Sequence, residues 1–160
     1  MVTTVDAVMD AVKTLVESVT PAIVPSASNA TATTFKHVES HLPWFSEEKG
    51  QEFGDFDRAF AIFAGTQAEG RAYGQMVDRD AEAQITLSVM YQPNLDSSMY
   101  NLEKRMARDS EQIESKLLKS PPAGCRTVNL TSRIPNRSPT PNPDKVTVEI
   151  EFRYTYRVNF

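Results

Sequence analysis

A chain of 160 residues with 40% hydrophobic and 24% charged side chains has the balance of an ordinary globular protein, and its length predicts one domain over residues 1–160. A formal net charge of −4 excludes a tight, sequence-independent grip on nucleic acid, because such binding needs a basic surface. The single cysteine, Cys125, excludes an internal disulfide, and the charged residues within the apolar N-terminal pattern predict neither a signal peptide nor a membrane span. We therefore expect a soluble protein of a reducing cytoplasm with no membrane partner.

The N-terminal third predicts one helix and two irregular segments. Residues 4–19 repeat apolar side chains at intervals of three and four, which is typical of an amphipathic helix, and Pro21 ends the pattern. Residues 20–34 are small, uncharged and interrupted by proline, so they predict an extended connector. Residues 44–57 mix acidic side chains with aromatic ones and predict an acidic surface loop anchored by its rings.

The middle of the chain predicts a hairpin followed by a second helix. Residues 58–65 form a short apolar run and residues 83–92 alternate apolar with polar side chains, so both are expected to be strands that pair. The glycine-containing connection, residues 65–82, is longer than a hairpin needs and predicts a functional or disordered loop. The next helix is capped by Asp96, Ser97 or Ser98 and stops at Pro121. Asp109 and Ser110 interrupt its apolar stripe, so its middle is expected to be less buried.

The last third predicts two strands joined by a proline-rich arm. Residues 125–134 form the first strand, and residues 135–144 carry four prolines, which favour a semi-rigid extended arm. Residues 146–160 alternate strictly between an apolar and a polar face, which is typical of a half-buried strand. Extended, these residues would run about 50 Å at roughly 3.3 Å per residue, whereas a compact chain of this size is roughly 40 Å across. The strand therefore bends or leaves its own domain.

The order of these elements predicts an α+β fold: an antiparallel four-stranded sheet with two helices on one face, in the order α-β-β-α-β-β, ending in a long C-terminal strand. The mixed charges on the polar face of the last strand are most simply a solvated sheet face.

Motifs that would carry catalysis or ligand binding are weak in this sequence. His37 and His41 lie four residues apart, but the neighbouring threonines and Pro43 favour an extended chain, which separates the two rings. Cys125 is interpreted as a small buried thiol, and the glycines of residues 65–74 lack the lysine of a phosphate-binding loop. We expect no enzyme, no metal site and no cofactor.

The element order resembles the tail terminator proteins of long-tailed bacteriophages, which are small α+β proteins that form a ring. The resemblance is carried by the strand RAFAIFAG, by AQITLSVMYQ running through proline into the helix DSSMYNLEKRMARDSEQIESKLL, and by the closing strand VTVEIEFRYTYRV. Together these segments extend over roughly residues 4 to 160.

The resemblance implies a structural protein of the virion, at the head-proximal end of the tail, that assembles in the host cytoplasm. Such a protein forms a homo-hexameric ring, ends the polymerisation of the tail tube protein, and offers its other surface to a neck or head-completion protein. DNA would pass through the lumen without specific binding, which suits an acidic chain.

Three sets of residues are assigned to this role. The tube-docking loop is assigned to Arg71, Tyr73, Gln75 and Met76. The ring interface is assigned to Tyr154, Tyr156, Val158 and Phe160. An acidic loop facing the neck or the lumen is assigned to Glu47, Glu48, Glu52 and Asp55.

Two alternatives stay open. Residues 44–57 and the proline-rich arm look like additions to a minimal terminator, so the chain could be another neck or head-tail joining protein. A non-viral α+β domain that binds a small molecule would instead use the aromatic face of the last strand to line a pocket. Helices with matching apolar stripes favour a core at that face.

Overall fold

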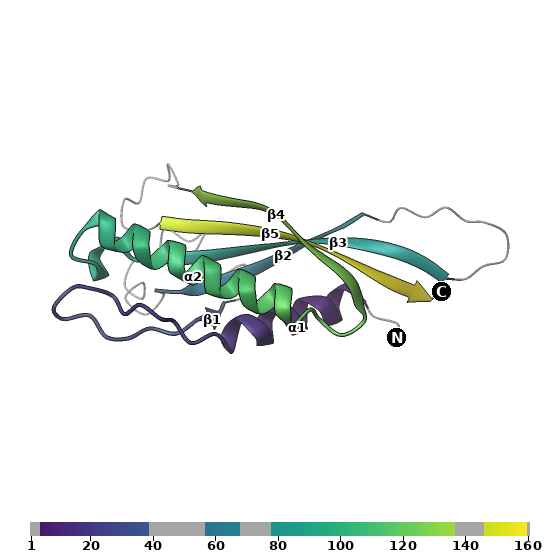
Figure 1. Ribbon diagram of the computed structural model, residues 1–160, viewed down its shortest axis with the longest axis horizontal. Coiled ribbons are helices and arrows are strands. Elements are labelled where there is room, and N and C mark those ends of the chain that lie inside the picture. The colour runs from purple at the N-terminus through teal and green to yellow at the C-terminus, as the bar shows by residue number, and fades with distance from the viewer. Residues whose placement is uncertain (1–3, 39–56, 68–77, 137–145, 160) are drawn as a thin grey trace, which may run out of the picture.

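The computed structural model describes residues 4–38, 57–67, 78–136 and 146–159, which form an α+β fold with both helices on one side of the sheet (Figure 1). In chain order the elements are α1 (Val5–Glu17), β1 (Lys36–His37), β2 (Ala59–Gln67), β3 (Asp78–Tyr91), a 3-10 turn (Pro93–Leu95), α2 (Met99–Lys119), β4 (Cys125–Asn136) and β5 (Val146–Asn159). The predicted α+β class with two helices and a long C-terminal strand is confirmed.

The sheet has five strands in the order β1-β2-β3-β5-β4. Strands β2 to β5 pair antiparallel, as predicted, but β1 pairs parallel with β2. The prediction of a purely antiparallel four-stranded sheet in the order α-β-β-α-β-β was therefore wrong. Strand β1 has two residues, too few to show a period-two pattern, and it is held by backbone bonds from Lys36 N to Arg58 O (3.2 Å) and from Val38 N to Phe60 O (2.9 Å).

The predicted hairpin of β2 and β3 is confirmed, but its strands are longer than predicted. β2 runs to Gln67 and β3 begins at Asp78, so much of the loop expected at residues 65–82 is paired strand. β4 likewise runs through Pro135 to Asn136, into the segment expected to be an arm. Proline is compatible with this position because β4 is an edge strand of the sheet. Polar composition concealed these strand ends in the sequence.

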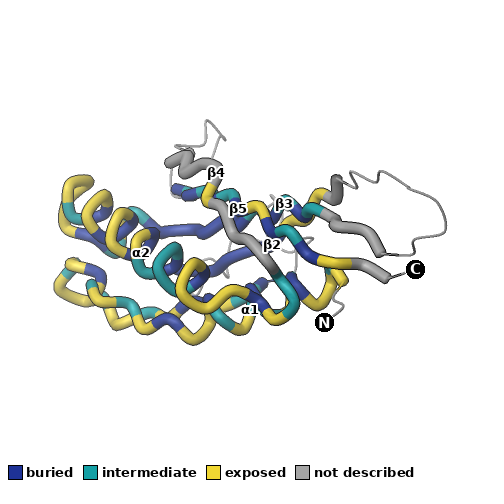
Figure 2. Tube along the Cα trace, turned by 45° about the vertical axis from the view of Figure 1, so that its right-hand side comes forward, coloured by how far each residue is buried: buried dark blue, intermediate teal, exposed yellow. Residues whose placement is uncertain are grey.

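The core lies between the helices and the facing side of the sheet. Alternate residues of β3 and β5 point into it, and α1 contributes the fully buried Val8, Val12 and Val16. Figure 2 shows buried residues along the central strands and exposed ones on the outer sides of the helices. Both helices begin at a side-chain cap, because Thr4 accepts a hydrogen bond from Ala7 N (3.4 Å) and Ser98 accepts one from Asn101 N (3.2 Å).

Candidate functional site

A cluster of charged side chains is buried where β2 begins and β3 ends. Its members are Asp57, Arg58, Asp96, Arg105 and Asp109. Asp109 and Arg105 are 0% exposed and Arg58 is 1% exposed. The expectation that Asp109 and Ser110 make the middle of α2 less buried was wrong. Asp109 pairs with Arg58 from outside the helix, and the Ser110 hydroxyl donates to the Met106 carbonyl one turn earlier in α2. We call this cluster the ionic network.

Arg58 uses all five of its N–H groups. Its Nε donates to Asp109 Oδ2 at 2.6 Å and its Nη2 to Oδ1 at 3.0 Å, which makes a two-point ion pair. The other donors reach the carbonyl of Ile23 (2.5 Å) and the carbonyl and hydroxyl of Thr33 (3.2 and 3.1 Å). Arg58 holds a φ of +61°, which a non-glycine residue adopts only where its surroundings hold it. The guanidinium thus joins α2, the connector and β2.

Arg105 lies between two carboxylates. Its Nη1 and Nη2 donate to the two oxygens of Asp57 at 2.6 and 3.0 Å, while Nη2 and Nε donate to Asp96 Oδ2 at 2.7 and 2.9 Å. The guanidinium also lies 5.2 Å from the centre of the Tyr91 ring, whose hydroxyl donates to Asp109 Oδ2 at 3.0 Å. Burial, and then the nearby Asp109 carboxylate, raise the pKa of Tyr91, so its phenol stays a donor.

The connector between α1 and β1 is fastened to α2 through this network. Ser26 donates from its backbone N–H and its hydroxyl to Asp96 Oδ1, both at 3.2 Å, and the Thr33 hydroxyl donates to Asp57 Oδ2 at 2.6 Å. Gln112 adds bonds to Ala22 N and to the carbonyl of Thr20. Because arginines, hydroxyls and backbone groups already occupy these carboxylates, the network holds the fold together instead of presenting a group to a ligand.

At the other end of the sheet, two of the described strands run beyond their neighbours. β3 and β5 pair along all 14 of their residues, from Asp78 with Asn159 to Tyr91 with Val146. β2 is paired with β3 only as far as Glu82, and β4 with β5 only as far as Tyr156. Within the described ranges, Asp78–Ala81 and Arg157–Asn159 therefore have no flanking strand. We call this part of β3 and β5 the strand extension; it runs beyond the ends of both helices (Figure 1).

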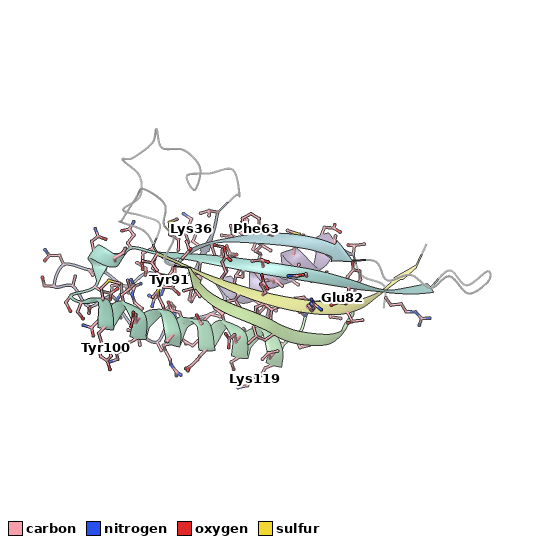
Figure 3. All side chains as sticks on the ribbon, turned by 90° about the horizontal axis from the view of Figure 1, so that it is seen from above. Lys36, Phe63, Glu82, Tyr91, Tyr100 and Lys119 are labelled. Atoms are coloured by element: carbon pink, nitrogen blue, oxygen red, sulfur yellow. The ribbon has the colours of Figure 1, made fainter. Side chains whose placement is uncertain are left out.

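The sheet face that turns away from the helices is polar along its middle. Arg153 on β5 reaches Glu82 on β3, with 3.5 Å between Nε and Oε1, and both side chains are partly open to solvent. Phe63 on the neighbouring strand β2 is 43% exposed on this face (Figure 3). Mixed charges at cross-strand positions agree with the expected solvated face.

The residues assigned from the sequence fall in three groups. Tyr154 and Tyr156 face the helices and are 0% and 4% exposed, so a single chain already buries both rings in its core. The Val158 backbone belongs to the strand extension, but its side chain is not described. The remaining assigned residues lie outside the described ranges: Glu47, Glu48, Glu52, Asp55, Arg71, Tyr73, Gln75, Met76 and Phe160.

Other polar features of the described residues have structural explanations. His37 lies in β1 with its ring 5.5 Å from that of Phe60, which agrees with the expected extended backbone, and His41 is outside the described ranges. Burial raises the pKa of the half-buried Cys125 thiol, which makes it a poor nucleophile. A surface groove of about 630 Å³ runs between the end of α1 and α2. Its Lys116 and Lys119 complement the negative end of the α2 dipole.

The part of the chain that the structure describes holds no cluster of three or more potential metal ligands, and none of its helices is long and apolar enough to cross a membrane. No protein-family model matches the chain, and comparison with curated proteins finds no significant relative.

Proposed function

We propose that this chain is a structural protein of a phage virion that forms a ring on the head-proximal end of the tail tube. There it ends tube polymerisation and joins the tail to the neck or head. The observation that carries the proposal is the strand extension, in which β3 and β5 continue together past the sheet and the helices. A lone two-stranded ribbon is marginally stable in water, so a neighbouring subunit is its natural cover.

We assign the contact between neighbouring subunits to the strand extension instead of to Tyr154 and Tyr156, because the core buries both of these side chains. Contacts between unlike surfaces close into a ring when the rotation between copies closes, and an extension at one end of each protomer supplies one such surface. The tube-docking role stays with residues 68–76, and the neck or lumen role stays with the acidic loop. A negative net charge lets DNA slide through the lumen without being held.

The small-molecule alternative loses its main support. It requires the aromatic face of β5 to line a pocket, whereas Phe152, Tyr154 and Tyr156 fill the core between sheet and helices. A different neck or head-tail joining protein remains the second candidate, because such a protein would use the same extension against a different partner.

The first experiment is to measure the mass of the purified protein by light scattering, with and without tail tube protein, and to image the mixture. A ring, alone or on tube ends, is expected. A chain ending after Tyr156 should stay folded but lose the ring, whereas Glu111→Gln on the exposed side of α2 should keep it. Deleting residues 68–76 should leave rings that no longer cap tubes. A monomer that ignores tubes contradicts the proposal, and strong salt-dependent DNA binding contradicts the sliding role.

A further inference from the structure

Among the described residues, the outer edge of β2 carries few of the devices that normally protect an edge strand. Its sequence AFAIFAGTQ has no charged residue and no proline, and its register with β3 is unbroken from Ala59 to Gln67. β1 covers this edge only at Ala59 and Phe60, and no other described strand pairs there. Exposed, regular and apolar edges pair readily with another strand.

The backbone groups that face this edge can be identified. The carbonyls of Arg58 and Phe60 accept hydrogen bonds from β1, so they point away from β3. Because hydrogen-bonding direction alternates along a strand, Ile62, Ala64 and Thr66 also direct their N–H and C=O groups outward. Within the described ranges, no strand pairs with these outward groups of β2 beyond Phe60.

The opposite edge of the same sheet is the outer side of β4, and it matches in direction. β2, β3, β5 and β4 pair antiparallel in succession, so the two outer strands run in opposite directions. In a ring, copies are related by rotation and keep the same strand direction. β4 of one copy beside β2 of the next therefore continues the antiparallel pattern without interruption.

The outer edges of β2 and β4 also match in their position along the strand direction and in one pair of side chains. Through the cross-strand pairs, Ala61 is level with Ile134 and Gln67 is level with Thr127. Ala64 shares its row with Ile85, Phe152 and Leu130. Leu130 is 39% exposed although the other large residues of that row are buried, and a neighbouring Ala64 would cover it.

The register of β4 suits a curved assembly. It shifts twice against β5, between Cys125 and Thr127 and between Leu130 and Ser132. Such bulges add local twist, which curves a sheet toward closure. Pairing of β2 with a second β2 would stop at a dimer and leave both β4 edges open, so it does not extend the assembly.

We propose that adjacent copies of this chain join edge to edge, with Ala61–Gln67 of β2 pairing antiparallel with residues 127–134 of β4 in the next copy, so that Ala64 lies beside Leu130. The inference rests on the proposed ring and specifies how that ring closes. The strand extension adds a second contact between the same copies.

Ala64→Pro removes an N–H that faces the edge and spares the bonds to β3, because proline is tolerated in edge strands at outward positions. It should convert rings to monomers while circular dichroism and the melting temperature stay near wild type. Phe63→Lys, on the neighbouring residue whose backbone faces β3, is the matched control and should keep the ring. If the Ala64→Pro variant forms rings as the wild type does, the inference is overturned.

A paired-cysteine variant tests the register even if the proline variant folds poorly. Ala64→Cys with Leu130→Cys, in a Cys125→Ser background, should give a ladder of covalent multimers on oxidation. Two strands separate the residues within one chain, roughly 14 Å at about 4.8 Å per strand spacing, so a disulfide cannot form internally. Rings that cap tubes without cross-linking overturn the edge pairing but keep the proposed function. Cross-linked rings that do not bind tubes support the edge pairing and contradict the proposed function.

Discussion

Replacing Asp109 by Asn removes one charge from the ionic network and leaves the shape of the side chain nearly unchanged. Asp109 is 0% exposed and makes a two-point ion pair with Arg58, which is 1% exposed. Without the carboxylate, the guanidinium keeps its place beside α2 with its charge uncompensated. Breaking a buried pair from one side typically costs about 3–5 kcal/mol. A domain of this size has a total unfolding free energy of roughly 5–15 kcal/mol.

Urea denaturation followed by circular dichroism measures this loss. With a slope of about 2 kcal/mol per molar urea, the midpoint should fall by roughly 2 M. Glu111→Gln is the matched control because it removes the same kind of charge from the same helix. Its ion pair with Arg108 is 3.2 Å long and more than half exposed at both partners, so its loss should change stability by less than about 1 kcal/mol.

The two variants together test whether the buried ion pair stabilises the fold. If Asp109→Asn unfolds at the same urea concentration as Glu111→Gln, water reaches the network and the buried pair does not stabilise the fold. If the slope of the transition falls as well, the variant has changed the compactness of one of its states or lost two-state unfolding, and the midpoint no longer reports one buried pair.

Three further outcomes are expected. Tyr154→Phe should raise the unfolding free energy by about 1 kcal/mol in a urea titration, because the buried hydroxyl of Tyr154 has no hydrogen-bond partner among the described residues; a loss of similar size would indicate an unseen partner. Above pH about 10, stability should fall, because the folded chain keeps the Tyr91 proton at a pH where the unfolded chain releases it. An unfolding free energy that does not fall between about pH 9 and about pH 11 would contradict this. Ser98→Ala removes the cap of α2 and should lower the melting temperature through a cost of about 1 kcal/mol, whereas an unchanged melting temperature would mean that the cap bond does not contribute.

The long elements were predictable from periodicity because each buries one side of a regular repeat. The alternation of β5 and the three-four repeats of α1 and α2 follow directly from core packing, and the structure has these elements close to the predicted bounds. The ends of β2 and β3 were missed because the β3–β5 pairing carries polar residues beyond the core, where no apolar alternation marks a strand. Backbone hydrogen bonds hold these strand ends, and such bonds leave no pattern in the sequence.

The ionic network was missed for a different reason. Its partners are far apart in the sequence, as Arg58 and Asp109 are, and each one separately looks like a solvated charge. One local sign was available: Asp109 falls on the apolar stripe of α2, and Arg105 lies one turn before it on the same face. A pair of opposite charges on a buried stripe indicates partners elsewhere, although it does not identify them.

The position of the ionic network indicates what its buried charges contribute to the fold. Apolar residues of similar size often stabilise a core equally well, so the net stability of buried ion pairs is a weak reason for their presence. Arg105 and Asp109 contact the sheet end at two points roughly 6 Å apart along α2, and a shift of the helix by one turn would break both sets of bonds. The network therefore fixes α2 lengthwise on the sheet. That fixed position determines how far β3 and β5 run beyond the helices, and so the length of the strand extension.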